Sequence, residues 1–473
     1  MTAEIGAIRA FRDVMQAGGL EPPDSSQLEI IERRPLYACG FPLENAAAAC
    51  IAACGSAVSE LWELRTGRRQ RVRVDSRRAG AALLSFAFAR AQDAPSIADR
   101  SGRPTVALYR AGDGRWIHLH GGFPHLHEGT IRALGCGESA EEIARAVAGW
   151  EAQKLEDVLA EQRMCGAMVR SAREWSRHPQ GRELARRSLV EIERIGDAPP
   201  QRLGPGARPL EGIRALDLTR VLAGPSCGRT LAEHGADVLR ISSPALPSVP
   251  PFVVDTGHGK LSAYLDLERA SDLDRLRNLI GATDVFAQGY RSGSLERRGL
   301  GPSALAELRP GLIYVSMNCY GHEGPWRNRP GWEQLAQSVT GLAHAHGGAD
   351  SPALVPAAAC DYMTGFLAAF GTLVALGRRA REGGSWHVRV SLSRTGMWLH
   401  QLGQESGDRS LTALPLQPEE RDRFSMTTET PWGRLQHLSA CVELSETPAR
   451  WERPSVPLGT HPPEWPGSVP QAI

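Results

Sequence analysis

The stretch IRALDLTRVLAGPSCGRTLAEHGADVLRI (213–241) decides the fold class of this chain. Its apolar run 213–218 predicts a strand, residues 225–234 predict a helix, and the apolar run 236–241 predicts a second strand. A strand, a helix and a strand in direct succession predict parallel pairing through a right-handed crossover. The sequence therefore predicts an α/β fold with a Rossmann-like parallel sheet.

The same alternation continues as far as residue 318 and extends the large domain. Three more strands and two helices are predicted, the strands at 262–267, 282–288 and 312–318 and the helices at 271–280 and 304–308. Five strands with intervening helices are enough for an open parallel sheet.

The N-terminal part of the chain has a different pattern. We expect an Ala-rich helix at 43–66, a short strand at 71–75 and helical stretches within 138–190. The run TVALYRAGDGRWIHLH (105–120) predicts a β-hairpin that turns at its Gly-Asp-Gly segment. This mixture predicts a smaller α+β domain beside the large one.

Composition indicates where the domains meet. Residues 197–210 are rich in Pro and Gly, which is typical of a linker. We therefore divide the chain into residues 1–200, a linker at 201–210, a large domain at 211–400 and a C-terminal tail at 401–473. The tail is Pro-rich, and we expect it to wrap irregularly over other elements without a core of its own.

An internal repeat relates the two halves of the chain. Residues 361–396 match residues 45–80 without a gap, with eleven identities in 36 positions, and such a repeat outranks other signals in deciding architecture. The match places Asp361 opposite Asn45, each at the head of an apolar helix. A carboxylate can act as a nucleophile, and a primary amide is far poorer at it. Residues 1–200 are therefore predicted to be a truncated copy without the catalytic group.

The bulk composition excludes several classes of function. The 473 residues include 54 Lys and Arg against 53 Asp and Glu, so neither nucleic acid nor an acidic membrane is an expected partner. Nine scattered cysteines without a Cys-x-x-Cys pair are typical of reduced thiols in the cytoplasm. The N-terminus lacks the apolar core of a signal peptide, and no long apolar run predicts a membrane span. We expect a cytoplasmic enzyme.

Ligand chemistry is expected at the carboxyl ends of the parallel strands. After the first strand, Gly224-Pro225 opens a helix, which aims free N–H groups at an anion. After the fourth strand, Tyr290, Arg291 and Arg297 lie in a Gly-containing loop that suits phosphate binding. After the last strand, Tyr320 lies in a loop rich in Gly and Pro, where functional residues are frequent.

Six segments in a fixed order resemble the family III CoA-transferases, the CaiB/BaiF family, which includes formyl-CoA transferase, carnitine CoA-transferase and α-methylacyl-CoA racemase. The segments are 208–244, 259–267, 284–301, 314–326, 329–342 and 356–376. The catalytic aspartate of that family stands at a helix head after a PGxxxxxQxxxG segment. Here that position is Asp361.

The resemblance implies the family's fold and activity, the movement of CoA from an acyl-CoA thioester to a free carboxylic acid. Asp361 would form an acyl-aspartyl anhydride and then an aspartyl-CoA thioester, which splits a difficult exchange into easier steps. Coenzyme A enters as a substrate, and no metal is expected. The candidate CoA-binding residues are Val221, Gly224, Pro225, Lys260, Tyr290, Arg291, Arg297 and Tyr320.

The order of the pieces departs from the family. The run GDGRWIHLHGGFPHLHEGTIRAL (112–134) resembles the family's small-domain hairpin, although it precedes the large domain in this chain. Family members are interlocked homodimers. The resemblance therefore implies that residues 1–200 complete the large domain, either within one chain as a pseudo-dimer or across a homodimer.

Three alternatives remain open. The first alternative is an acyl-CoA racemase. Racemases of this family use a histidine where this chain has Trp332, which cannot shuttle a proton, so the sequence disfavours this activity. Two H-x-H pairs, His118 with His120 and His125 with His127, raise the hypothesis of a zinc site, although no further ligand pattern completes it. The last alternative is a protein that binds CoA esters without turning them over, because one copy lacks the carboxylate.

Overall fold

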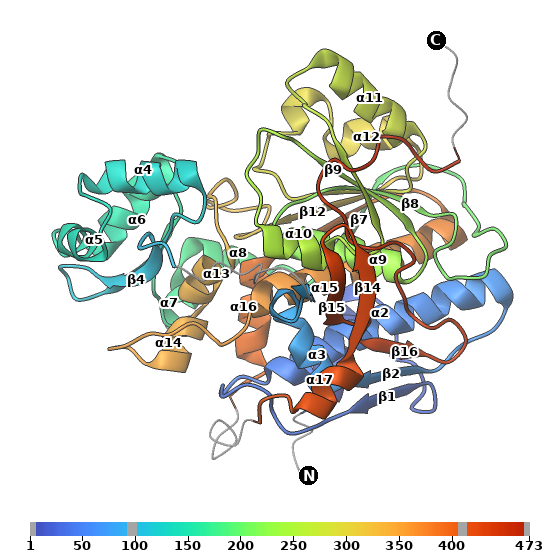
Figure 1. Cartoon of the computed structure of the whole chain (residues 1–473), viewed down its shortest axis with the longest axis horizontal. Helices are drawn as coiled ribbons and strands as arrows, with labels where there is room; N and C mark the ends of the chain where they lie inside the picture. Colours follow the sequence, from blue (N-terminus) through green and yellow to red (C-terminus); the bar gives the residue numbers. More distant parts are fainter. Residues whose placement is uncertain (1–5, 92–101, 405–413, 468–473) are drawn as a thin grey trace.

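The structure is a computed structural model that describes residues 6–91, 102–404 and 414–467 (Figure 1). Its centre is a seven-stranded sheet in the order β10-β9-β8-β11-β12-β13-β7. Six strands run parallel, and β7 at the edge is antiparallel, which confirms the predicted parallel sheet. The strands are β7 (Glu191–Gly196), β8 (Arg214–Leu218), β9 (Asp237–Ser242), β10 (Lys260–Tyr264), β11 (Val285–Gln288), β12 (Ile313–Asn318) and β13 (Ser385–Ser391).

Helices cover both faces of this sheet because successive strand residues point to opposite faces. In β8, Ala215 belongs to one core and Leu216 to the other. The second core is closed by α11 (Ala270–Gly281) and α12 (Pro302–Leu308). The first is closed by α9 (Ala223–Glu233) and α15 (Ala359–Glu382), which lie on the opposite side of the sheet in Figure 1.

A second layer lies beyond α15. The helix α2 (Leu43–Thr66) packs along α15, and a three-stranded sheet covers its far side. That sheet consists of β1 (Leu28–Ile31), β2 (Val72–Asp75) and β16 (Val442–Leu444), with β1 parallel and β16 antiparallel to β2. The helix α1 (Ala7–Gly18) packs against α2 from the side.

The two repeat segments form the same elements. An offset of 316 residues carries both ends of α2 onto the ends of α15, and it carries the starts of α3 (Ser76–Ala82) and α16 (Leu392–Gln401) onto one another. A Cβ at Gly55 would lie 2.6 Å from the side chain of Val72, and a Cβ at Gly371 would lie 2.6 Å from that of Val388. Each helix therefore crosses its own strand at a glycine, because nothing larger fits.

The edge strands are exchanged between the two halves of the chain. The N-terminal strand β2 is flanked by β16, which comes from the C-terminal tail. The C-terminal strand β13 is flanked by β7, which comes from the N-terminal half. Each half therefore completes the sheet of the other.

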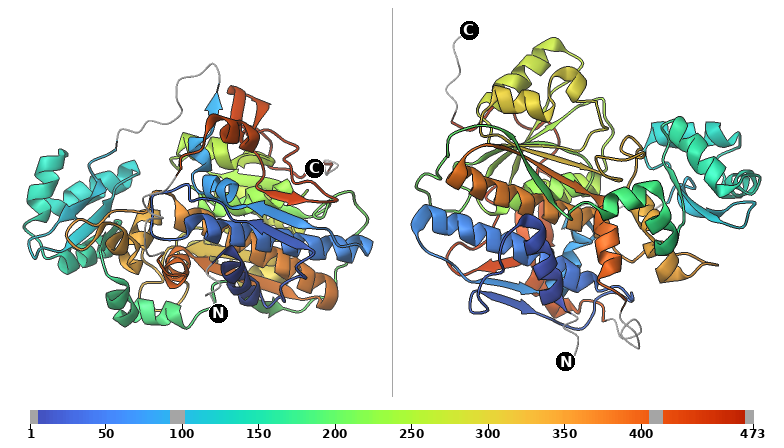
Figure 2. Two further views of the ribbon diagram at one scale, coloured as in Figure 1. Left: turned by 90° about the horizontal axis from the view of Figure 1, so that it is seen from below. Right: turned by 180° about the vertical axis from the view of Figure 1, so that it is seen from behind.

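A small antiparallel unit projects from the side of this body, as all views in Figures 1 and 2 show. It contains the predicted hairpin, β4 and β5, joined by β6. Its interface with the body includes the backbone N–H of Arg170, which donates to the carbonyl of Ser338. Its elements are β4 (Val106–Arg110), β5 (Trp116–His120), β6 (Gly166–Met168), α4 (Pro124–Leu134), α5 (Ala140–Val147) and α6 (Ala152–Glu161).

Short elements connect these bodies. They are η1 (Ser85–Ala87), β3 (Arg90–Ala91), α7 (Ala172–Arg177), α8 (Pro179–Ala185), α10 (Pro250–Thr256), η2 (Glu296–Arg298), α13 (Glu333–Thr340) and α14 (Leu342–Gly347). None of the nine cysteines forms a disulfide.

The expectation of an irregular tail was wrong for residues 418–444. The tail forms α17 (Pro418–Phe424) and a hairpin of β14 (Ser425–Thr430) and β15 (Gly433–Leu438), which pairs with β3. Phe424 and Leu438 also join a small core with Leu416. β-branched threonines and a turn glycine with φ of 93° at Gly433 favour this hairpin.

Two helices, α2 and α15, are long and apolar enough to cross a membrane, with mean hydropathies of 1.2 and 1.4. The apolar window of α2 is 83% buried within the protein and that of α15 is 100% buried. Core helices pass the same test of length and composition, and the packing of this pair accounts for their apolar character.

Candidate functional site

Asp361 lies in the first turn of α15, and its surroundings are supplied by α13. Its backbone N–H donates to Glu333 Oε2 at 2.5 Å, and the N–H of Cys360 donates to Glu333 Oε1 at 3.1 Å. Gln337 donates to the same Oε1 at 2.6 Å. The carboxylate of Glu333 therefore caps α15, and Asp361 does not act as the N-cap, a position that Ala358 occupies.

The environment of Asp361 disfavours its charged form. Asp361 is 7% exposed, and burial raises the pKa of its carboxyl well above the usual range, with the negative charge of Glu333 as the second cause. Burial also raises the pKa of Glu333, while its three donors act in the opposite direction. Such a pair holds a proton that must leave before either group can act as a nucleophile or base.

The head of α15 abuts the head of α9. A Cβ at Gly365, one turn beyond Asp361, would lie 2.4 Å from the carbonyl oxygen of Ala223. Just before α9, Val221 has a φ of 70°, a left-handed conformation that is a genuine outlier for a β-branched residue. Strain of this kind concentrates at functional sites, and it lies here just before the head of α9, which abuts α15 one turn beyond Asp361.

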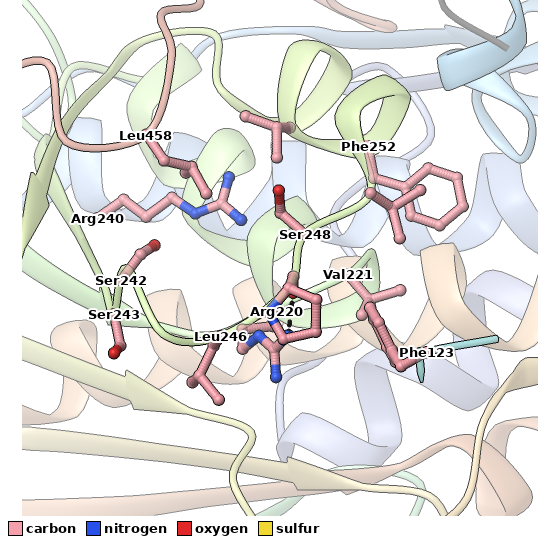
Figure 3. Close-up of a pocket in the computed structure, with 13 residues that line it drawn as sticks. Phe123, Arg220, Val221, Arg240, Ser242, Ser243, Leu246, Ser248, Phe252 and Leu458 are labelled. Atoms are coloured by element: carbon pink, nitrogen blue, oxygen red, sulfur yellow. Dashed lines mark hydrogen bonds between the residues drawn. The ribbon is translucent and has the colours of Figure 1, made fainter. Parts of the chain in front are cut away.

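A small pocket opens at the carboxyl ends of β8 and β9 (Figure 3). Ser242 and Ser243 lie on one side of it, and Val221 and Phe123 lie on another. The whole lining is Phe123, Arg220, Val221, Arg240, Ser242, Ser243, Leu246, Pro247, Ser248, Val249, Phe252, Val253 and Leu458.

Two arginines give this pocket a positive character. Arg240 is 4% exposed, and its Nε and Nη1 have no hydrogen-bond partner among the residues that the structure describes. Burial lowers the pKa of its guanidinium. Arg220 donates to the carbonyl of Pro247, and its guanidinium carbon lies 5.3 Å from the ring centre of Phe123. A buried cation with unused donors favours an anionic ligand.

The structure brings some of the predicted binding residues to this pocket. Val221 lines it, and Gly224 and Pro225 form the buried first turn of α9 beside it. Tyr290 lies near both arginines, whose charges act to lower the pKa of its hydroxyl against the larger effect of burial.

The other predicted binding residues lie elsewhere. Lys260 is buried, with its Nζ 2.7 Å from Asp217 Oδ2 and 2.7 Å from the carbonyl oxygen of Pro225. Lys260 therefore fixes the first turn of α9 through this carbonyl and does not line the pocket. Arg291 and Arg297 are exposed and do not line it either. Tyr320 is buried, with its ring against Trp326.

Sequence reasoning did not select Glu333, Arg220 or Phe123. Glu333 had a signal, since it is the one acidic or basic side chain of the Asp, Glu, Lys and Arg types between Arg329 and Asp350, and Arg240 had a similar one inside a strand. Phe123 had none, because it comes from a unit far away in the sequence.

The histidine pairs make separate contacts. The rings of His118 and His120 lie 6.5 Å apart, and His127 Nδ1 contacts the hydroxyl of Thr105. His125 is exposed beside Phe123. Within residues 6–91, 102–404 and 414–467, no three His, Cys, Asp or Glu side chains converge as metal ligands would.

Comparison with known proteins gives a consistent family. The family model described as CoA-transferase family III matches residues 210–407. The chain is 34% identical over 319 residues to the acetyl-coenzyme A transferase nodX of Hypoxylon pulicicidum, which covers 62% of this chain and 54% of that protein. It is 31% identical over 272 residues to the probable fatty acyl-CoA transferase Rv3272 of Mycobacterium tuberculosis, which covers 52% of this chain and 68% of that protein.

Other matches are shorter. Succinyl-CoA:glutarate CoA-transferase of Mus musculus is 32% identical over 198 residues, 39% of this chain and 45% of that protein. A crystal structure of Rv3272 from M. tuberculosis aligns with a TM-score of 0.39 and 29% identity over 41% of this chain and 58% of that one. The chain spans little more than half the length of the first two curated relatives it matches, at 54% and 56%. By its sequence, the chain belongs to CoA-transferase family III.

Proposed function

We propose that this protein moves CoA from an acyl-CoA thioester to a free carboxylic acid, with Asp361 as the nucleophile. One observation carries this proposal: the buried Asp361 lies one turn before Gly365, where α15 abuts the head of α9, and Val221 just before α9 lines a pocket that holds a buried guanidinium with two unused donors. A nucleophile, an anion site and a strained turn in one place are typical of an active site.

The pocket supports CoA as the ligand that delivers the thioester. CoA carries phosphates, which match the unused donors of Arg240 and the guanidinium of Arg220. In our proposal the nucleotide occupies the side of Ser242 and Ser243 (Figure 3). The thioester end then approaches Val221, next to the head of α9, which abuts α15 at Gly365, one turn beyond Asp361.

The chemistry proceeds through three covalent intermediates, two anhydrides and one thioester. The carboxylate of Asp361 attacks the thioester carbonyl, which forms an acyl-aspartyl anhydride and releases CoA as a thiolate. The thiolate attacks the aspartyl carbonyl, which releases the donor acid and leaves an aspartyl-CoA thioester. The acceptor carboxylate attacks the carbonyl of this thioester, which forms a second acyl-aspartyl anhydride and releases the CoA thiolate. The thiolate then attacks the acyl carbonyl of that anhydride, which forms the new acyl-CoA and releases the carboxylate of Asp361.

The chain's own residues prepare the first attack. Glu333 fixes the backbone of Asp361 through the 2.5 Å hydrogen bond. The positive ends of α9 and α15 favour the negative charge that develops on the carbonyl oxygen. Loss of the proton that the raised pKa favours converts Asp361 into the reactive carboxylate.

Mass spectrometry after incubation with an acyl-CoA tests the proposal directly. We expect an adduct on the peptide that contains Asp361, which hydroxylamine removes because it cleaves anhydrides and thioesters. Asp361→Asn should carry no adduct. Absence of both the adduct and of CoA exchange with a series of free acids would overturn the proposal.

The low exposure of Asp361 favours a second candidate, a protein that binds CoA esters without transfer. Calorimetric titration with CoA separates the two. Binding without an adduct supports this second candidate, whereas binding with an adduct supports transfer.

A further inference from the structure

Phe123 is the residue through which the small unit reaches the pocket. It precedes α4, and it is the one pocket-lining residue that comes from the described residues 102–190. Its side chain is buried although the unit around it projects from the body. The ring is therefore placed at the junction between the small unit and the CoA-transferase core.

The ring of Phe123 lies between the pocket and the support of Asp361. On one side, the guanidinium carbon of Arg220 is 5.3 Å from its centre. On another side, the ring of Trp332 is 5.4 Å away, centre to centre. Trp332 directly precedes Glu333, which holds the backbone of Asp361. Figure 3 shows Phe123 at the same side of the pocket as Val221.

The backbone that carries Phe123 is tightly held. A Cβ at Gly121 would lie 2.3 Å from Thr105 Oγ1, and a Cβ at Gly122 would lie 2.9 Å from the ring of His120. The ring of His120 in turn stacks on Trp332 at 5.4 Å. Burial lowers the pKa of His120 to about 4, so this imidazole is neutral at pH 7. The imidazole that stacks on Trp332, just before α13, is therefore uncharged.

We propose that Phe123 is an aromatic gate between the CoA pocket and Asp361, which admits an apolar acyl group and excludes water from the acyl-aspartyl anhydride. This inference rests on the proposed function. In this proposal the ring, which packs on Trp332 next to Glu333, covers the approach to the buried carboxyl of Asp361. With a thioester bound, the ring packs with Trp332 against the acyl chain.

The gate decides between two outcomes of the same intermediate. In transfer, the CoA thiolate attacks the aspartyl carbonyl of the anhydride. In hydrolysis, a water oxygen bonds to a carbonyl carbon of the anhydride, the bond to the bridging oxygen breaks, and the water protons pass to the released carboxylate and to the CoA thiolate. Water exclusion from a reactive intermediate is a recognised contribution of enclosed active sites.

Three variants of the full-length chain test the gate. Phe123→Ala opens the approach, and Phe123→Leu keeps an apolar side chain there. Leu126→Ala is the matched control, because Leu126 is a buried residue of the same helix that packs into the main core. We expect Phe123→Ala to raise hydrolysis relative to transfer by about tenfold, while Phe123→Leu and Leu126→Ala keep the wild-type ratio.

Donor selectivity gives a second readout. Butyryl-CoA and succinyl-CoA have acyl chains of four carbons, and only the second carries a terminal carboxylate. We expect the wild type to prefer butyryl-CoA as donor, and Phe123→Ala to reduce that preference. A wild-type preference for succinyl-CoA would overturn the apolar selection.

A third readout does not depend on activity. A carbodiimide with an amine nucleophile should label Asp361 slowly in the wild type and at least about tenfold faster in Phe123→Ala, as followed by peptide mass spectrometry. Equal labelling rates, or an equal rise in Leu126→Ala, would overturn the gate. If the wild type neither transfers CoA nor forms an adduct, the proposed function fails, and the labelling result still decides whether Phe123 covers Asp361.

Discussion

At the scale of single residues, the buried carboxyl of Asp361 is both the proposed nucleophile and a group that lowers the stability of the fold when it is charged. The pKa of its carboxyl is raised by burial and by Glu333. A carboxyl whose pKa is higher in the folded state binds more protons when folded. It therefore contributes stability at acidic pH that is lost as pH rises through the folded-state pKa.

The variant Asp361→Asn should separate these two properties. We expect CoA transfer to fall by about 100-fold or more, because an amide cannot form the anhydride. The free energy of unfolding at pH 8 should rise by about 0.5–2 kcal/mol, because the variant no longer buries a carboxylate beside Glu333. Denaturant titrations at pH 5 and pH 8 check this, and a variant less stable than wild type at pH 8 would contradict it.

Glu333→Gln should change the pH dependence of transfer. Removal of the neighbouring negative charge lowers the pKa of Asp361, so the acidic limb of the rate profile moves to lower pH, while burial still holds it above that of a free aspartate. A stability loss of about 1–3 kcal/mol is expected because two buried N–H groups lose a charged acceptor. An unchanged acidic limb would show that the two carboxyls do not interact.

Arginines 240 and 297 offer a matched pair for CoA binding. Arg240→Met should weaken binding of CoA by about 1–3 kcal/mol, the range for a charge-assisted hydrogen bond. Arg297→Ala removes an exposed arginine outside the pocket lining, and we expect a smaller loss. Calorimetry with CoA at two salt concentrations measures both, and the larger loss at Arg297 would move the phosphate site to the loop after β11.

The sequence predicted Asp361 and Val221 as site residues from motif order and from position after a strand, and the structure places Val221 in the pocket lining and Asp361 buried in the first turn of α15. It did not separate Lys260 from Arg240, since both are cations within apolar strands. Only packing distinguishes them: Lys260 is neutralised by Asp217 at 2.7 Å, whereas Arg240 faces a pocket with unused donors. Phe123 could not be found from sequence, because its role depends on a contact with Trp332 across two separate units.

At the scale of elements, the crossing of α15 over α9 sets the site. Gly365→Ala places a Cβ 2.4 Å from the carbonyl oxygen of Ala223, which is backbone and cannot yield easily. We expect a stability loss of about 1–3 kcal/mol from overpacking, together with a fall in the rate of transfer. Gly377→Ala on the same helix meets only the end of the Arg381 side chain, at 3.2 Å.

The Gly377→Ala control should gain about 0.5–1 kcal/mol from helix propensity and leave transfer unchanged. Thermal unfolding and initial rates for both variants check the comparison. If both glycines behave alike, the helix crossing at Gly365 does not control the geometry of the site.

The sequence predicted helices and strands correctly where the hydrophobic pattern of a segment matched only one type of element. Strands buried on both faces appear as continuous apolar runs, and the predicted strands of the large domain each overlap an observed one. The hairpin at 425–438 was missed because its strands consist largely of polar residues and show no clear alternation of apolar and polar side chains. Its pairing with β3 is in addition a contact between segments far apart in the sequence. The hairpin at 106–120 carried a clear turn signal and was found.

At the scale of the whole molecule, we propose that the chain is an intrachain pseudo-dimer with a single site. The support is the exchange of edge strands, with β16 on the N-terminal sheet and β7 on the large one. Two segments with the same elements pack through α2 and α15, and only one of them carries a carboxylate at the helix head.

The two halves should therefore depend on each other. Residues 208–473 expressed alone lose β7, α2 and the small unit, and we expect them to aggregate or to show no transfer. Co-expression with residues 1–200 should restore soluble, active material, which size-exclusion chromatography and a CoA-transfer assay can measure. A monodisperse and fully active 208–473 fragment would contradict the pseudo-dimer.

The packing of α2 on α15 also sets the time at which the chain can fold on the ribosome. The apolar helix α2 is complete once residue 66 has been synthesised, but its partner ends at residue 382. At about 5–20 residues per second this interval lasts roughly 15–60 s. During that time an Ala-rich apolar surface has no native partner. Nascent chains stalled before residue 359 should therefore bind chaperones strongly, and those that have released β16 should not.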